Sequence, residues 1–169
     1  MLQRIEISPV EPLASDTAML HLRDVGQDEL QALSELCLRS KAVWGYDEPF
    51  MVACRAELTL LPAELGFTHL QVAERDRTVL GMAQIKIAGM HADLLKLFVE
   101  PGQMRSGVGR LLLRWAVVTA RGLGASRMII EADPGAAPFY ERLGARRTGF
   151  AASQSIVGRM LPRFQLDLE

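Results

Sequence analysis

Cysteine is scarce in this chain, and no residue pattern provides a metal site. The 169 residues include only 2 cysteines, Cys37 and Cys54, and no other Cys or His stands at metal-ligand spacing from them. Both fall within predicted helices, where cysteine is most simply a small buried apolar side chain. We therefore expect neither a metal nor thiol chemistry.

Long apolar runs and a strong net charge are absent as well. No stretch is apolar over enough residues to cross a bilayer, and the N-terminal segment lacks the charged-then-apolar pattern of a secretion signal. The formal net charge of −1 gives no overall positive field for nucleic acid. We therefore expect a cytoplasmic protein with neither a membrane nor a nucleic-acid partner.

Length and composition favour one folded domain. Of the 169 residues, 49% are hydrophobic, which is sufficient for a substantial core. Residues 1–17 include two prolines and are expected to form an N-terminal arm, either flexible or added to a sheet edge. Residues 18–169 are expected to form the domain.

The most informative segment is 94–114, LLKLFVEPGQMRSGVGRLLLR. It predicts an apolar strand, a Pro/Gly break, a basic loop with glycines, and an amphipathic helix. The first four N–H groups of a helix have no partner within it, and the helix dipole adds positive charge there, so an anion is the natural ligand. Gly107 and Gly109 allow a tight turn and a close approach of phosphate oxygens to the backbone. With Arg105 and Arg110 at the same end, the segment predicts a pyrophosphate site.

Two stronger phosphate motifs are excluded. The dinucleotide-binding fingerprint needs a third glycine where this chain has Leu112, and the nucleotide P-loop needs Gly-Lys-Ser/Thr, which is absent. Gly-x-Gly alone is weak evidence, because an ordinary strand-to-helix turn also accounts for it. The neighbouring segments therefore decide between the two interpretations.

Those neighbouring segments predict an α/β unit. A helix over 107–121 carries an apolar stripe at helical spacing, and a short buried strand follows over 127–132. Residues 133–144, DPGAAPFYERLG, predict a capped helix. Strands and helices that alternate with short connections predict parallel central strands. The rest of the chain predicts further elements: strands over 19–23, 68–74, 79–87 and 159–168, and helices over 28–40 and 47–58.

The chain resembles the GNAT superfamily of acyl-CoA-dependent N-acyltransferases. The resemblance rests on LFVEP before the loop, on MRSGVG at the position of the family's Q/R-x-x-G-x-G/A motif, and on ADPGAAPFYERLGA after the next strand. The first motif position, usually Gln or Arg, is Met104 here. We therefore expect less help from side chains in binding pyrophosphate, while binding through main-chain N–H groups is retained.

The resemblance implies a fold and a reaction. The fold is α/β (α+β), a three-layer domain with a mixed, mostly antiparallel sheet of about seven strands, a splayed parallel central pair, and about four flanking helices. The reaction is transfer of an acetyl group from acetyl-CoA to a primary amine of a small molecule or peptide, by direct attack with a tetrahedral intermediate. A homodimer is also expected. The alternatives are a CoA-binding module without catalysis and a purely structural α/β domain.

The same resemblance implies how acetyl-CoA binds. The strand backbone over 97–99 would pair with the pantetheine arm like an extra strand, and one freed N–H there would polarise the thioester carbonyl. The N–H groups over 105–110 would hold the pyrophosphate. The residues expected to bind the cofactor are Leu97, Phe98, Val99, Met104, Arg105, Ser106, Gly107, Val108, Gly109, Arg110, Asp133, Phe139 and Tyr140.

Tyr140 is the candidate general acid, because it aligns with a tyrosine that protonates the departing thiolate in many relatives. Simple packing of its ring, with the hydroxyl in water, is the alternative. The amine must lose a proton before it attacks, and some relatives use a carboxylate on the central strand where this chain has Leu94. Asp93 or Glu131 is the candidate base, with a water relay as the alternative. Asp93 is expected to face away from that position unless a bulge intervenes.

The first half is expected to supply the acceptor side. Trp44 and Tyr46, two large rings with polar edges, lie in the connection between the two N-terminal helices and suit the wall of a small-molecule pocket. They suit an ordinary hydrophobic plug equally well. His91, in an apparent turn over 89–92, is expected to be an exposed surface side chain.

Overall fold

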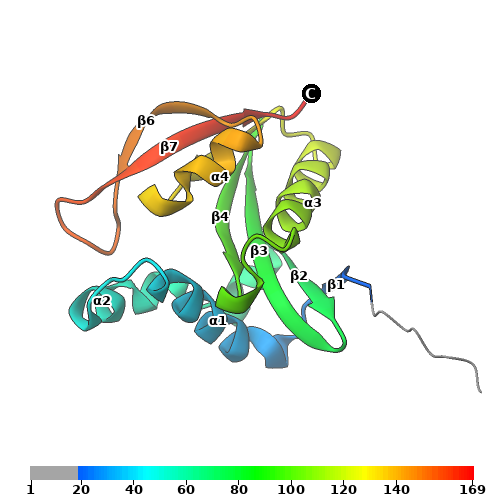
Figure 1. Ribbon diagram of the computed structural model, residues 1–169. Helices are drawn as coiled ribbons and strands as arrows, with labels where there is room; N and C mark the ends of the chain where they lie inside the picture. The colour runs from blue at the N-terminus through cyan, green and yellow to red at the C-terminus, as the bar shows by residue number, and fades with distance from the viewer. Residues whose placement is uncertain (1–18) are drawn as a thin grey trace, which may run out of the picture.

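The computed structural model describes residues 19–169. Its central element is a sheet of seven strands in the order β1-β2-β3-β4-β5-β7-β6 (Figure 1). The strands are β1 (His21–Asp24), β2 (His69–Arg75), β3 (Thr78–Ala88), β4 (His91–Val99), β5 (Arg127–Glu131), β6 (Arg146–Ala152) and β7 (Met160–Asp167). The helices are α1 (Leu30–Ala42), α2 (Glu48–Leu58), α3 (Val108–Gly122) and α4 (Ala137–Arg142). The predicted N-terminal arm, residues 1–17, lies outside the described residues.

Helices cover both faces of the sheet, as Figure 1 shows. On one face, Leu36 of α1 packs in a core cluster with Met82 of β3. On the other face, Leu112 of α3 packs in a second cluster with Ala83, the next residue of the same strand. Consecutive side chains of a strand point to opposite faces, so the two clusters lie on either side of the sheet. The predicted three-layer fold is confirmed.

The sheet opens between β4 and β5, which form the parallel pair among the described strands. Residues 91–94 of β4 pair with residues 127–130 of β5, and the pairing stops there. On its other side, β4 places Leu94 opposite Ile85 and Lys96 opposite Gln84, so Leu95 is the extra residue of a β-bulge. Beyond the bulge, β4 is paired with β3 alone and its other edge leaves β5. The predicted splayed central pair is confirmed.

The two N-terminal helices form where local signals predict them. The side chain of Asp47 accepts a hydrogen bond from the N–H of Phe50 at 3.0 Å, which caps α2. Both cysteines are free and buried, Cys37 in α1 and Cys54 in α2. Burial raises the pKa of the Cys37 thiol to about 12 and also raises the pKa of Cys54. The interpretation of both as buried apolar residues is confirmed.

One local prediction is wrong, and one predicted helix forms with a different first turn. His91 does not lie in the turn, because it opens β4 and pairs with Ala88 across a two-residue turn that begins at Gly89, where φ is +61°. The predicted helix over 133–144 begins with a 3₁₀ turn, Pro134–Ala136, and only α4 is α-helical. In both places a residue with special backbone geometry, glycine or proline, sets the boundary.

The described helices are short. The longest, α3, has 15 residues, and none of the helices between residues 19 and 169 has the length and apolarity to cross a bilayer. Within the same part of the chain, no three His, Cys, Asp or Glu side chains gather as metal ligands.

Gly81 of β3 tests the close packing of α3 on the sheet. A Cβ atom at this position would lie 2.8 Å from the backbone oxygen of Phe98 and 3.0 Å from Cγ1 of Val108. We predict that Gly81→Ala lowers the free energy of unfolding by about 1–3 kcal/mol, measured by urea denaturation, because a packed interior cannot accommodate the added atom. Gly66→Ala is the control, since nothing lies within 4 Å of a Cβ there. Equal unfolding midpoints for the two variants would contradict this packing.

Candidate functional site

The loop between β4 and α3 presents backbone N–H groups without acceptors. The N–H of Ser106 donates to the carbonyl of Gln103 at 3.3 Å. Helix α3 follows, and no side chain caps its first turn. Since the helix dipole adds positive charge at this end, the loop suits an anion. Within the described part of the chain, the other N–H groups over 105–110 make no hydrogen bond: those of Arg105, Gly107, Val108, Gly109 and Arg110.

The two glycines of the loop have different roles. Gly107 has φ +91°, a left-handed conformation that favours glycine, and it turns the chain into α3. At Gly109, a Cβ atom would lie 3.3 Å from Cζ of Phe139. Because glycine has no Cβ atom, α4 can pack against the start of α3. The sequence predicted close approach of a phosphate at Gly109, and it did not predict this contact with Phe139.

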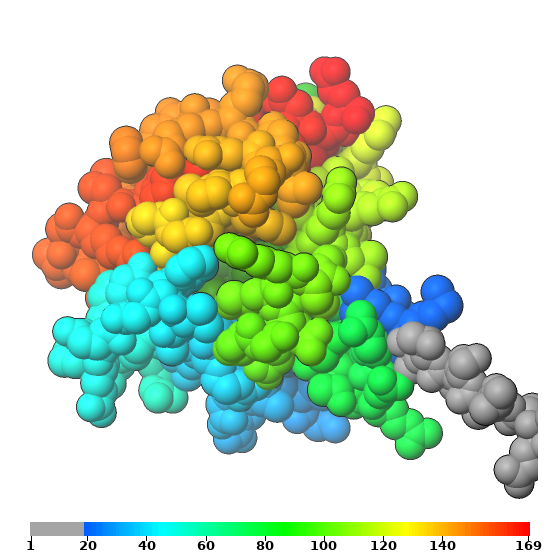
Figure 2. Space-filling model, in the orientation of Figure 1, coloured from blue at the N-terminus to red at the C-terminus, as the bar shows by residue number. Residues whose placement is uncertain are grey.

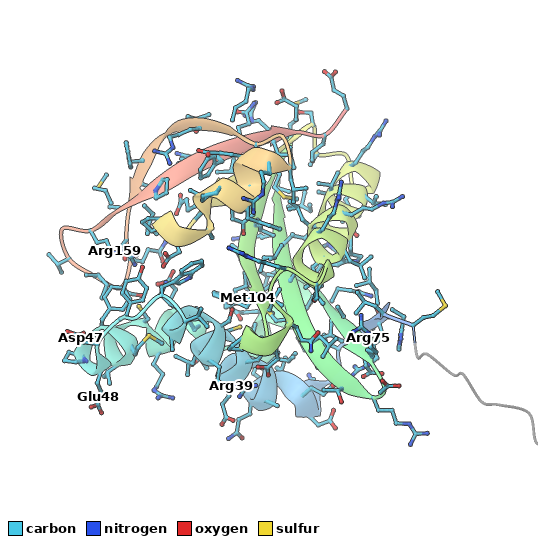
Figure 3. All side chains as sticks on the ribbon, in the orientation of Figure 1. Arg39, Asp47, Glu48, Arg75, Met104 and Arg159 are labelled. Atoms are coloured by element: carbon cyan, nitrogen blue, oxygen red, sulfur yellow. The ribbon has the colours of Figure 1, made fainter. Side chains whose placement is uncertain are left out.

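The side chain of Met104, labelled in Figure 3, packs against the core. It is partly buried against the cluster that contains Val99 of β4 and Leu112 of α3. It therefore helps to hold the loop on the sheet, while contact with an anion is left to the backbone. This packing gives a physical reason for an apolar residue at a motif position that usually has Gln or Arg.

The free edge of β4 leads into this loop. The N–H of Glu100 donates to the carbonyl of Leu80 on β3 at 2.8 Å, and because N–H groups alternate along a strand, those of Val99 and Leu97 point to the opposite edge. There the N–H of Val99 donates to Oγ of Ser40 at 3.3 Å. Figure 2 shows the surface hollowed beside this loop (green), between the α1–α2 segment (cyan) and the α4 segment (gold).

Tyr140 of α4 is buried on the same side of the sheet as α3. Its ring lies edge-on to Phe139, with centroids 5.0 Å apart, and it belongs to a core cluster with Phe164. Its hydroxyl makes no hydrogen bond with a described residue, and because that part of the chain has no fully buried, unpartnered side-chain oxygen, the hydroxyl reaches accessible space. Burial raises the pKa of the Tyr140 phenol well above its ordinary value. The phenol is therefore protonated at neutral pH.

On the opposite face, a cavity of about 460 Å³ lies at the opening between β4 and β5. The end of α2, the following turn and the β6–β7 hairpin complete its walls. Both base candidates, Asp93 and Glu131, line this cavity, so the structure brings them to one site. Asp93 lies 3.6 Å from Nε2 of His91. Their roles in the reaction stay predictions.

The sequence did not indicate three further charged residues that line the cavity. Glu57 and Glu64 line it from α2 and the turn after it, and Lys96 lines it from β4. The bulge at Leu95 reverses the alternation of side chains, so that Lys96 shares the face of Asp93. No local pattern in the sequence indicates that these side chains meet, because α2 reaches the cavity only after it has packed on the sheet.

Trp44 and Tyr46 do not line this cavity. A Cβ atom at Gly135 would lie 2.5 Å from the ring of Trp44, so this ring covers the glycine of the turn between β5 and α4. Tyr46 stacks on Phe50 with centroids 3.9 Å apart. These contacts agree with the packing alternative, and a role in acceptor binding stays a prediction.

Asp133 connects three segments beside the opening. Its Oδ2 accepts hydrogen bonds from the hydroxyl of Tyr46 at 2.6 Å and from Nη2 of Arg159 at 3.3 Å. Nζ of Lys41 lies 3.6 Å from the same oxygen, and Oδ1 accepts from the N–H of Gly135 at 3.1 Å. Arg159, labelled in Figure 3, comes from the β6–β7 hairpin. The Asp133 carboxylate thus bonds to three segments of the protein, and its predicted contact with cofactor stays a prediction.

Comparison with known proteins agrees with this architecture. Residues 30–145 match the family model described as the acetyltransferase (GNAT) family. No curated protein sequence matches the chain at a significant level.

Solved structures share the fold at low sequence identity. The PaiA N-acetyltransferase of Thermoplasma acidophilum, in complex with coenzyme A, superposes with a TM-score of 0.71 at 17% identity, over 88% of this chain and 99% of that one. A GCN5-related N-acetyltransferase of Rhodopseudomonas palustris gives 0.74 at 19% identity, over 89% and 97% of the two chains. The YncA protein of Salmonella typhimurium, solved with its cofactor acetyl-CoA, gives 0.65 at 20% identity, over 90% and 95%.

The pKa values of the 2 tyrosines of the chain, Tyr46 and Tyr140, report how far each phenol is buried. Burial raises the pKa of Tyr46 to about 12, and the hydrogen bond to Asp133 acts in the same direction. The fold therefore favours the neutral phenol: this stabilisation is complete below the ordinary tyrosine pKa of about 10 and is lost as pH rises through about 12.

We predict that tyrosinate absorbance develops at higher pH in the folded protein than in urea. Tyr46→Phe removes one of the two titration steps and leaves that of Tyr140. Titration of either phenol in the folded protein at the ordinary value of about 10 would contradict the burial described here.

Proposed function

Because the chain belongs to the acetyltransferase (GNAT) family, we propose that it transfers the acetyl group of acetyl-CoA to a primary amine of a small molecule or peptide. The observation that carries this proposal is the row of N–H groups without acceptors at the start of α3, beside the free edge of β4. The opening between β4 and β5 joins this edge to a cavity on the other face, where an acceptor can enter. Cofactor and acceptor would thus meet from opposite faces of one sheet.

The residues present fit coenzyme A. A diphosphate needs several hydrogen-bond donors near positive charge, and the backbone over 105–110 supplies both through its N–H groups and the helix dipole. The amide groups of a pantetheine arm need backbone partners, and Leu97 and Val99 offer the free edge of β4. Ser40 holds the N–H of Val99 at 3.3 Å, so its hydroxyl would turn away when the arm binds. Acetyl-CoA, when bound, supplies the activated acetyl group.

Proton transfers would then fall to residues of the two faces. A phenol is protonated at neutral pH even at its ordinary pKa of about 10, so Tyr140 carries the proton that a departing thiolate requires. Burial raises the pKa of this phenol and makes it a weaker acid, so the transfer requires a direct hydrogen bond to the sulfur. On the acceptor side, Asp93 or Glu131 can take the proton of the amine directly or through water. Holding both partners on one scaffold would supply much of the rate.

Two features of the sequence favour the alternative, a CoA-binding module without catalysis: Met104 at the first motif position and the absence of a carboxylate at Leu94. The first no longer counts against catalysis, because Met104 packs against the core. The second still stands. Release of CoA from acetyl-CoA in the presence of an amine distinguishes the acetyltransferase from the binding module.

A homodimer and a cytoplasmic location stay predictions. The outer strand β6 exposes Phe150, with 59% of its surface accessible, which suits an edge that a second copy could cover. Light scattering coupled to size-exclusion chromatography gives the oligomeric state.

Arg110 allows the backbone N–H to be separated from the side-chain charge. It is the third residue of α3, where proline is tolerated because the N–H has no partner in the helix. We predict that Arg110→Pro weakens CoA binding at least about tenfold more than Arg110→Ala, measured by calorimetry, because a hydrogen bond to a charged group is lost. Equal affinities in two folded variants would argue against an anion at these N–H groups.

Tyr140→Phe tests the general acid. Thiol release from acetyl-CoA is followed over a panel of primary amines, and we predict that kcat falls by about 10²-fold or more while affinity for CoA is unchanged. Tyr46→Phe is measured beside it as the variant that lacks the other phenol of the chain, with its fold verified because Tyr46 also bonds to Asp133. An unchanged kcat in Tyr140→Phe would refute the assignment, and tight CoA binding without turnover on any amine would favour the binding module.

A further inference from the structure

A chain of buried polar side chains runs from Thr68, just before β2, to Gln84 of β3 and Lys96 of β4. Oγ1 of Thr68 donates to the carbonyl of Glu64 at 2.7 Å, and Nε2 of Gln84 donates to Oγ1 of Thr68 at 3.1 Å. The chain ends at Nζ of Lys96, which donates to Oε1 of Gln84 at 3.1 Å. All three side-chain groups belong to buried residues, with 7%, 0% and 8% of their surfaces accessible for Thr68, Gln84 and Lys96. The chain fixes the position of the Lys96 ammonium.

This ammonium has no counter-ion within the described part of the chain. No carboxylate oxygen there lies within 4.0 Å of Nζ, and the one hydrogen bond of the three it can donate goes to a neutral amide. A buried charge without an opposite charge is costly, so such groups are normally paired. Lys96 also lines the cavity at the opening between β4 and β5. An anionic group of a molecule bound in that cavity would supply the counter-ion that the Lys96 ammonium lacks.

The other charges of the cavity have the opposite sign. Asp93 and Glu131 line it from the two central strands, and Glu57 and Glu64 line it from α2 and the turn that follows. None of these carboxylates pairs with Lys96. A molecule that carries one anionic and one cationic group therefore matches the cavity better than a simple amine does.

We propose that Lys96 binds a carboxylate of the acceptor, so that the acceptor class is an amine that also carries a carboxylate, as amino acids do. This inference rests on the proposed function. Lys96 precedes Leu97, whose N–H lies on the free edge of β4, and neighbouring Cα atoms are about 3.8 Å apart. A carboxylate held at Lys96 keeps the amine of the same small molecule near that edge, with Asp93 and Glu131 beside the ammonium.

Lys96 also donates to the buried side-chain oxygen Oε1 of Gln84, and if its role were purely structural, this bond would be its whole function. The two roles differ in one measurable quantity, the preference for acceptors with a carboxylate. A structural defect lowers activity on all amines alike, whereas loss of a carboxylate contact affects only the acceptors that carry one.

The experiment compares amino acids with their α-amides, for example lysine, glutamate, alanine and phenylalanine, at concentrations expressed as free amine. We expect the wild-type protein to prefer the carboxylate member of at least one pair by about tenfold or more in kcat/KM. Lys96→Met should abolish this preference, mainly through a higher KM for the amino acid, and Lys96→Arg should retain it. Lys86→Met, at an exposed lysine of the neighbouring strand, should leave it unchanged.

The outcomes separate the inference from the function on which it rests. Turnover with equal rates for both members of every pair, or a preference for the amides, overturns the carboxylate site and leaves the acetyltransferase intact. CoA binding without turnover on any amine overturns the proposed function and this inference with it. If Lys96→Met does not fold, the wild-type preference and its retention in Lys96→Arg decide the question.

Discussion

The site depends on the separation of β4 from β5 after four paired residues. A strand edge inside a protein has backbone N–H and C=O groups that must find partners. The bulge at Leu95 and the departure of β5 leave such an edge over the second half of β4. Ser40 satisfies one of its N–H groups. An extended ligand that carries amide groups can form with this edge the same hydrogen bonds that a neighbouring strand would form.

The opening between β4 and β5 is also reached from both faces of the sheet, and each face carries a different part of the site. On one face, α3 directs its unpaired N–H groups to the end of the free edge, and α4 places Tyr140 beside it. On the other face, α2 and the β6–β7 hairpin enclose a charged cavity. Asp133 joins the α1–α2 segment to the β6–β7 hairpin through Tyr46 and Arg159, so these two segments and the turn after β5 are held together.

The sequence alone predicted the parts of the site that are local in the chain. The loop and α3 follow from glycine spacing and helical periodicity, and most strands follow from apolar runs. The bulge at Leu95 depends on pairing with β3, so the orientation of Lys96 could not be derived from alternation. The bonds of Arg159 to Tyr46 and Asp133 join segments far apart in the chain. Strand β6 had no apolar alternation to reveal it, because its side chains are mostly exposed.

Whether the N–H groups at the start of α3 bind the diphosphate of coenzyme A is tested most directly by two-dimensional NMR of the ¹⁵N-labelled protein during titration with CoA. The amide signals of Arg105 and of residues 107–110 should shift most, and that of Ser106, already bonded to Gln103, should shift less. The same pattern should appear with 3′-phosphoadenosine diphosphate, which lacks the pantetheine arm. Saturable binding of CoA that leaves these signals in place would contradict the site described here.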